Sequence, residues 1–176
     1  MKKIFLSLLA LLLIQTTCYS KDILQFDFPN EGWHQVDSID KKSTKKCFVP
    51  HGQTVENHTE MIVFSERVLK TQGLTALTLL HKQLGKDKNN YLDIIPEYVY
   101  ADMDNAMVAW CSQLRNTCAV TRAFKGNQGV VFATYLNKAP HYSQNMFGQW
   151  SNILSKVKVY EPQQGQAQAT NLIDLN

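Results

Sequence analysis

The chain has 176 residues, 44% of them hydrophobic, and its 18 basic and 15 acidic residues give a formal net charge of +3. Lys2 and Lys3 belong to a predicted leader, and removing these two charges lowers the formal charge from +3 to +1. A nearly neutral chain has no general electrostatic attraction to nucleic acid, so we expect no nucleic-acid partner. The length and the ordinary hydrophobic content favour one domain, which we place at residues 21–160.

Residues 1–20 have the three-part order of a cleavable signal peptide: two lysines, an apolar run over residues 4–14, and a polar end. The apolar run is shorter than the roughly 20 residues that a membrane-spanning helix needs. The alternative is a lipoprotein attached at Cys18, but residues 15–17 lack the bulky apolar side chain of a lipoprotein signal. We therefore expect a secreted or periplasmic protein with no transmembrane segment in the mature chain.

The first half of the chain predicts strands separated by polar turns. Apolar and β-branched residues favour strands at residues 23–28, 33–39 and 47–49, and a longer strand within residues 59–69. The first helix is predicted at residues 74–84, where leucines recur at helical spacing and a glycine follows in the position of a left-handed cap.

The second half predicts more strands and one further helix. The predicted strands are residues 94–100, 106–111, 118–124, 130–136 and 157–160. Ser143 is a predicted N-cap for a helix whose apolar residues fall on one face. The three tryptophans lie in apolar periodic segments and are assigned to the core rather than to a ligand platform; they are Trp33, Trp110 and Trp150.

Consecutive strands with two helices predict an α+β fold, in which a mostly antiparallel sheet is flanked by two main helices. A doubly wound parallel sheet would need regular alternation of strands and helices. Residues 161–176 are rich in Gln and Ala and poor in apolar side chains, so we expect them to form a disordered tail.

Cys47, Cys111 and Cys118 remain after removal of the leader, and three thiols allow one disulfide and one free cysteine. Cys111 and Cys118 end two predicted strands. If these strands pair, the two cysteines lie opposite each other within bridging distance. We predict this disulfide, although spacing alone does not fix connectivity and leaves Cys47 as another possible partner.

The densest group of chemically active side chains lies at residues 47–60 and comprises Cys47, His51, Glu56, His58 and Glu60. Imidazole and carboxylate groups bind zinc or carry protons, and a cysteine beside a histidine can form a nucleophilic thiolate. The spacing matches no HExxH motif, and a polar loop is the simpler interpretation. We assign no catalytic residue, metal or cofactor, and keep a small hydrolase or metal-dependent enzyme as an alternative.

Four lysines form a candidate basic surface loop: Lys41, Lys42, Lys45 and Lys46. Such a loop can meet anionic lipid headgroups or an acidic protein, at about 1 kcal/mol per basic residue near an anionic surface. The alternative is a solvated loop without a partner. The expected partner is therefore a protein or an anionic lipid surface.

The stretch FVPHGQTVENHTEMI at residues 48–62 resembles a motif of small uncharacterised secreted proteobacterial proteins, F-x-P-x-G-x-T-x-x-N-W-T-E-M. As in those proteins, a glycine-bounded hairpin at residues 126–132 precedes a terminal helix with a tryptophan, here Trp150. His58 stands where the motif has its tryptophan, so no role of that tryptophan is carried over.

The resemblance implies an α/β sandwich similar to the Mog1/PsbP type, which often serves as a binding scaffold. It also implies similarity to substrates of type II secretion in Legionella-like bacteria. No activity follows from a fold alone. Because common catalytic motifs are absent, we expect an exported, non-enzymatic binding or effector module. A periplasmic accessory protein of an envelope or secretion machine is a further alternative.

Overall fold

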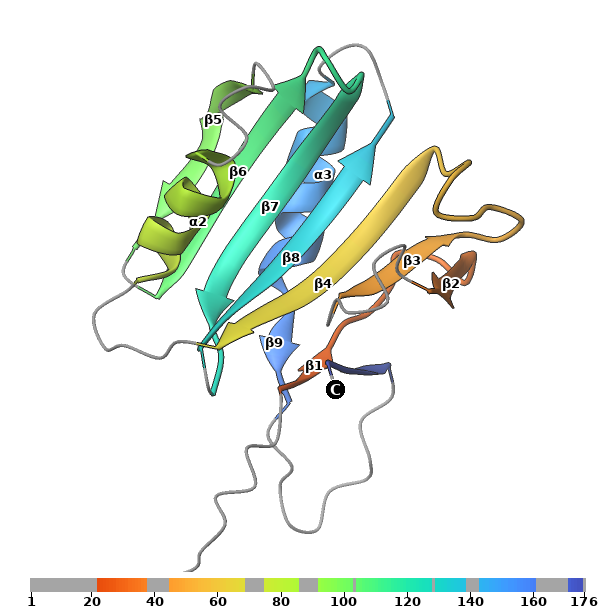
Figure 1. Cartoon of the computed structure of the whole chain (residues 1–176), viewed down its shortest axis with the longest axis horizontal. Helices are drawn as coiled ribbons and strands as arrows, with labels where there is room; N and C mark the ends of the chain where they lie inside the picture. Colours follow the sequence, from red (N-terminus) through yellow and green to blue (C-terminus); the bar gives the residue numbers. More distant parts are fainter. Residues whose placement is uncertain are drawn as a thin grey trace, which may run out of the picture.

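The computed structural model describes residues 22–37, 45–68, 75–85, 92–102, 104–127, 129–138, 143–160 and 171–175. These residues form a large sheet with a helix on each face and a smaller second sheet beside it (Figure 1). The strands are β1 (Ile23–Gln25), β2 (Trp33–Val36), β3 (Lys46–Pro50), β4 (Glu60–Val68), β5 (Leu92–Ala101), β6 (Asn105–Ser112), β7 (Thr117–Lys125), β8 (Gly129–Asn137), β9 (Lys158–Val159) and β10 (Leu172–Asp174). The helices are α2 (Ala76–Gly85) and α3 (Gln144–Ser155).

The large sheet has seven strands in the order β2-β3-β4-β8-β7-β6-β5, and every neighbouring pair is antiparallel. In this sheet β4 pairs with β8 along their whole length, from Glu60 opposite Asn137 to Val68 opposite Gly129. This pairing connects the two halves of the chain. It also brings residues more than 60 positions apart in the sequence onto one face of the sheet.

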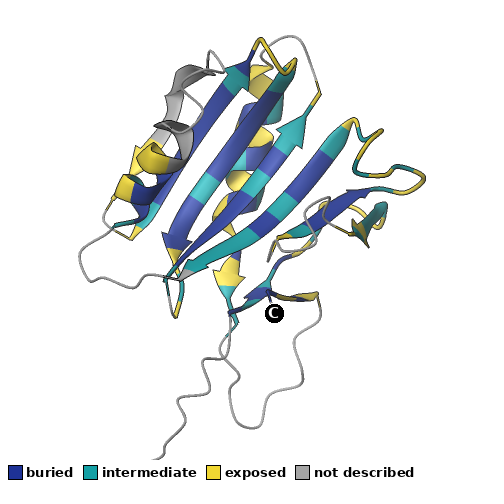
Figure 2. Cartoon of the chain, in the orientation of Figure 1, coloured by how far each residue is buried: buried dark blue, intermediate teal, exposed yellow. Residues whose placement is uncertain are grey.

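Both faces of the central strands are apolar, so the sheet needs a covering layer on each side. Successive residues of β6, β7 and β8 point to opposite faces, and most of them are buried (Figure 2). On one face α2 packs through Ala76, Leu79 and Leu80, and on the other α3 packs through Phe147, Trp150 and Leu154. The apolar residues of α3 recur at the spacing of one helix face, which explains why this segment is helical.

Arg122 of β7 holds the C-terminal end of α3. Its Nη1 atom donates hydrogen bonds to the carbonyl oxygens of Leu154, Ser155 and Val157, at 2.8, 2.9 and 2.7 Å. The guanidinium also lies 4.5 Å from the centre of the Phe124 ring. The last carbonyls of a helix have no partner within the helix, and a cation there interacts favourably with the helix dipole.

The predicted disulfide between Cys111 and Cys118 is confirmed. β6 and β7 are neighbouring antiparallel strands, and Cys111 lies directly opposite Cys118 with their Cα atoms 4.0 Å apart. The turn between them closes at Asn116, whose φ of 49° is the left-handed conformation that asparagine tolerates better than most residues. Cys47 is the free thiol among the described cysteines.

The predicted α+β sandwich of the Mog1/PsbP type, with two main flanking helices, is wrong. The described residues are dominated by ten strands in two sheets, whereas α2 and α3 have only 10 and 12 residues. Two such short helices cannot cover both faces of a seven-stranded sheet. On the face that α2 covers in part, the apolar residues Cys47, Val49 and Met61 are packed against the half-buried Val55, which lies in the turn after β3.

The predicted disordered tail over residues 161–176 is wrong at its end. β10 pairs with β1, with Leu24 opposite Ile173, and the side chain of Leu175 is fully buried. β1 pairs on its other side with β9, so the three strands form the smaller sheet. Residues 161–170 and the predicted leader at residues 1–20 lie outside the described residues.

Candidate functional site

A pocket of about 430 Å³ opens at the end of the large sheet, on the face that α3 covers. The turn before β2, the start of β4, the end of β8 and the first turns of α3 surround it. This volume lies within the range of small-molecule sites. The residues that line it combine aromatic and polar side chains: Pro29, Asn30, Trp33, Glu60, Tyr135, Asn137, Ser143, Met146, Gln149 and Trp150.

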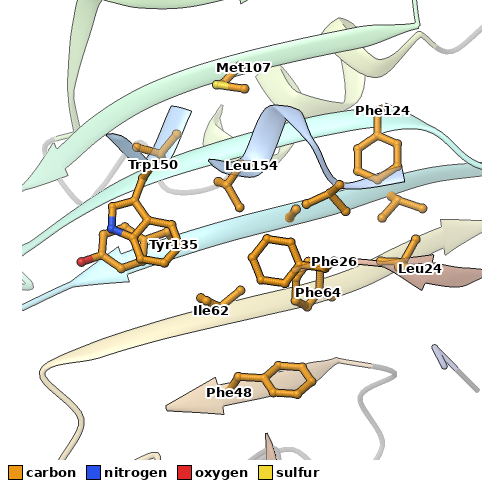
Figure 3. Close-up of a cluster of buried hydrophobic side chains, with 14 of the residues drawn as sticks. Leu24, Phe26, Phe48, Ile62, Phe64, Met107, Phe124, Tyr135, Trp150 and Leu154 are labelled. Carbon is orange, nitrogen blue, oxygen red and sulfur yellow. The ribbon is translucent and has the colours of Figure 1, made fainter. Parts of the chain in front are cut away.

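The aromatic wall of the pocket is built from three rings. Trp150 of α3 stacks on Tyr135 of β8, with ring centres 3.8 Å apart and planes only 11° apart (Figure 3). Trp33 of β2 meets Trp150 at 6.0 Å and at 79°, an edge-to-face contact. Trp150 is almost completely buried, whereas Trp33 is half-buried. The pocket wall is therefore rigid at Trp150, with Trp33 as its more exposed member.

The Tyr135 hydroxyl is the centre of a polar network on the pocket floor. It accepts a hydrogen bond from Asn137 Nδ2 at 3.1 Å, and the Glu60 carboxylate lies close enough to act on it electrostatically. Burial raises the pKa of Tyr135 above its ordinary value, and the negative charge of Glu60 raises it further. The hydroxyl therefore stays protonated at neutral pH.

Strand pairing and helix spacing place these side chains together. Glu60 lies opposite Asn137, and two positions further along β4 Ile62 lies opposite Tyr135, so all four residues belong to the same face. Met146 and Trp150 are four residues apart on α3 and share one helix face. Asn137 Nδ2 lies 3.3 Å from Met146 Sδ and so contacts α3 from the sheet.

The predicted polar cluster does not converge on one point. His58 Nδ1 lies 2.6 Å from the Val55 carbonyl oxygen, which can only accept, so Nδ1 carries a hydrogen. Burial lowers the pKa of His58, which keeps the ring neutral. Glu56 Oε2 accepts a hydrogen bond from the Thr54 hydroxyl at 2.7 Å, and this bond lowers the pKa of the exposed Glu56 carboxyl. The hydrogen bonds of His58 and Glu56 therefore stay within the turn that carries these two residues.

His51 pairs instead with a residue outside the predicted cluster. Its ring stacks on that of His34 with centres 5.2 Å apart and planes 5° apart, and its backbone N–H donates to the Gly32 carbonyl at 2.7 Å. Glu60, the last member, faces the pocket. Among the described residues no group of three or more His, Cys, Asp or Glu side chains is placed to hold a metal ion.

Cys47 lies in the apolar cluster on the opposite face of the sheet from the pocket, with Val49 and Met61. Its side chain is only 5% exposed, and burial raises the pKa of its thiol. A thiol in this setting stays protonated and behaves as a small apolar side chain. The geometry gives no support to a Cys47 nucleophile.

The basic loop is described only in part. Lys45 is exposed and Lys46 starts β3, while Lys41 and Lys42 lie outside the described residues. A protein or anionic lipid partner for this loop stays a prediction.

The pocket was missed by the sequence analysis, apart from Glu60. Trp110 and Trp150 are buried as predicted, but Trp33 and one side of Trp150 line the pocket. The sequence signal that could have indicated the site is the polar Asn137 after the apolar strand, together with the cap of the helix that follows it. That Asn137 lies opposite Glu60 depends on the pairing of β4 with β8, and this pairing is not visible in the sequence.

No family model matches the chain, and no curated protein is similar to it. The resemblance of residues 48–62 to secreted proteobacterial proteins therefore stays a prediction. In the part of the chain that the structure describes, no helix has the length and apolar character to cross a membrane. The disulfide is compatible with an oxidising compartment, outside the cell or in the periplasm.

Proposed function

We propose that this protein is an exported, non-enzymatic binding module that takes up a small polar ligand in the pocket between β4, β8 and α3. The observation that carries the proposal is the pocket itself. It combines a fixed aromatic wall, Trp150 stacked on Tyr135, with hydrogen-bonding groups at its floor and rim. Ligand sites typically combine apolar and aromatic walls with a few placed polar groups.

Binding fits the chemistry of the pocket better than catalysis does. Acid-base or nucleophilic catalysis needs a nucleophile and a base within hydrogen-bonding reach. Among the described lining residues there is no histidine or cysteine, and Glu60 is the only carboxylate. The raised pKa of Tyr135 disfavours its anion, so this hydroxyl is a poor base. The polar groups are therefore suited to orient a ligand.

Export is part of the proposal and rests on two independent features. The leader-like order of residues 1–20 indicates secretion, and the Cys111–Cys118 disulfide is stable in an oxidising compartment. An accessory protein of the envelope would have the same two features. Cell fractionation separates the two, because an accessory protein stays with the envelope whereas a secreted module reaches the medium.

The three tryptophans offer a direct test of ligand binding. Their indole N–H groups give separate NMR signals, and Trp33 and Trp150 line the pocket while Trp110 lies on the opposite face, bonded to Thr121. We expect titration with millimolar polar fragments of cationic, neutral and anionic type to shift the signals of Trp33 and Trp150. The Trp110 signal is the internal control and should stay in place. The proposal fails if no class of fragment moves the two pocket signals.

Trp33→Ala supplies the matched mutation for this test. Trp33 is half-buried at the pocket mouth, so its removal should weaken fragment binding while the protein stays folded. An unchanged affinity in the folded variant would contradict the assignment of this wall to the ligand.

A further inference from the structure

We infer that the ligand of this pocket carries an ammonium group, which lies against Trp33 and pairs with the Glu60 carboxylate. The inference rests on the proposed function and adds the chemical class of the ligand. Among the described lining residues Glu60 is the only one with a formal charge, and that charge is negative.

The Glu60 carboxylate is half-buried, and within the described part of the chain no basic side chain forms an ion pair with it. Taking a carboxylate partly out of water costs free energy that a cation can offset. Its neighbour, the Tyr135 hydroxyl, stays protonated and so brings no positive charge to it. An ionised carboxylate has about four acceptor positions, so donors from a ligand can be accommodated.

The nearest lysine along the strand does not supply this cation. Lys138 follows Asn137, the residue opposite Glu60, but its Nζ atom donates to the Glu56 carbonyl oxygen at 3.3 Å. Lys138 is exposed and its ammonium is directed to the turn after β3. Lys138 therefore does not neutralise the Glu60 carboxylate.

The aromatic wall also favours a cation. The face of an indole ring carries negative electrostatic potential and attracts ammonium groups, by about 0.5–1 kcal/mol at exposed sites and more when the pair is desolvated. One face of Trp150 is covered by Tyr135, and Trp33 stacks on Phe28 with ring centres 6.4 Å apart. Trp33 is the more exposed of the two indoles, so its remaining face is the one that a ligand reaches first. Trp33 and Glu60 line the same pocket.

Among the described residues, the N-terminal end of α3 is the feature that opposes this assignment. Ser143 caps the helix at the pocket rim, and a helix start carries roughly half a positive charge. However, the Ser143 hydroxyl already accepts a hydrogen bond from the Met146 N–H, which satisfies one of the free N–H groups of the helix start. The full negative charge of Glu60 is also larger than the half charge of the helix, so the pocket keeps a negative net charge.

Three probes of nearly equal shape test the inference: benzylamine, benzyl alcohol and benzoate, which are cationic, neutral and anionic at neutral pH. We expect benzylamine to bind the purified protein about tenfold more tightly than benzyl alcohol, since a hydrogen bond to a charged group contributes more than a neutral one. Benzoate should bind weakest. The affinities are read from the Trp33 and Trp150 indole signals.

Glu60→Gln should remove the preference for the amine while leaving the affinity for the alcohol nearly unchanged. Glu56→Gln is the control, because this exposed carboxylate on the neighbouring turn does not line the pocket. If Glu60→Gln does not fold, the test is the order of the affinities of the three probes for the unmodified protein. Equal binding of amine and alcohol, or a preference for benzoate, overturns the ammonium assignment but leaves the binding function standing. If none of these probes and no fragment binds, both fail.

Discussion

Tyr135 shows how one buried hydroxyl can organise a site. Its ring stacks on Trp150, and its hydroxyl accepts a hydrogen bond from Asn137 and lies near the Glu60 carboxylate. Burial disfavours the charged form of a phenol, and a neighbouring carboxylate disfavours it further, so both effects act in the same direction. The ring and the hydroxyl together fix the geometry of the pocket floor before any ligand arrives.

The raised pKa of Tyr135 predicts a loss of stability in alkali. The folded protein holds this proton more tightly than the unfolded chain, whose tyrosines ionise near pH 10. The stabilisation is fully present below that pH and is lost as the pH rises above it, by up to about 1.4 kcal/mol per pH unit. We expect Tyr135→Phe to reduce this slope in urea unfolding measured across alkaline pH. Tyr160→Phe is the control outside the pocket, and equal slopes in both variants would contradict the prediction.

At the scale of single elements, α3 is held at both ends by side-chain groups. Ser143 caps its start, and Arg122 satisfies carbonyl groups at its end. The helix carries Met146, Gln149 and Trp150 into the pocket. Fixing the helix along its length therefore also fixes the pocket wall.

Arg122→Met keeps the apolar stem of the side chain and removes its hydrogen-bond donors. Three carbonyl groups near the end of α3 then lose a partner, and we expect the free energy of unfolding to fall by about 2–3 kcal/mol. Lys125→Met is the matched control on the same strand, because the Lys125 ion pair with Asp104 is exposed and 3.9 Å long. Its effect should stay within about 0.5 kcal/mol. Urea unfolding gives both values, and similar losses would argue against the anchoring role of Arg122.

The local elements were largely predictable from the sequence. The strands predicted at residues 106–111 and 118–124 are β6 (Asn105–Ser112) and β7 (Thr117–Lys125), because alternation and turn residues are local signals. The helices were found for the same reason. The share of the chain in sheet and the position of Glu60 beside Asn137 were not predicted, since they depend on pairing between distant segments.

At the scale of the whole molecule, the C-terminal residues are part of the core. The composition of residues 161–170 predicted disorder for the whole tail, but the last apolar residues find a partner in β1, almost 150 positions earlier. A composition rule considers each segment alone and does not register such a partner. Leu172 is 38% exposed and Leu175 is fully buried, so the two leucines have different roles.

Leu175→Ala should therefore destabilise the protein by about 2–4 kcal/mol, the usual cost of removing a buried leucine side chain. Leu172→Ala removes the same atoms from an exposed position and should change the stability by about 0.5 kcal/mol or less. Thermal unfolding of the two variants makes the comparison. Equal effects would mean that the C-terminal strand does not contribute to the folded state.

The pairing of β1 with β9 and β10 also sets an order of events during synthesis. β1 is the first described strand to be made, yet both of its partners lie in the last fifth of the chain. Contacts between residues so far apart form late, because the entropy of closing the intervening loop must be overcome first. The smaller sheet therefore closes only when the chain is almost complete, and until then β1 has two unpaired edges that another strand or a chaperone can bind.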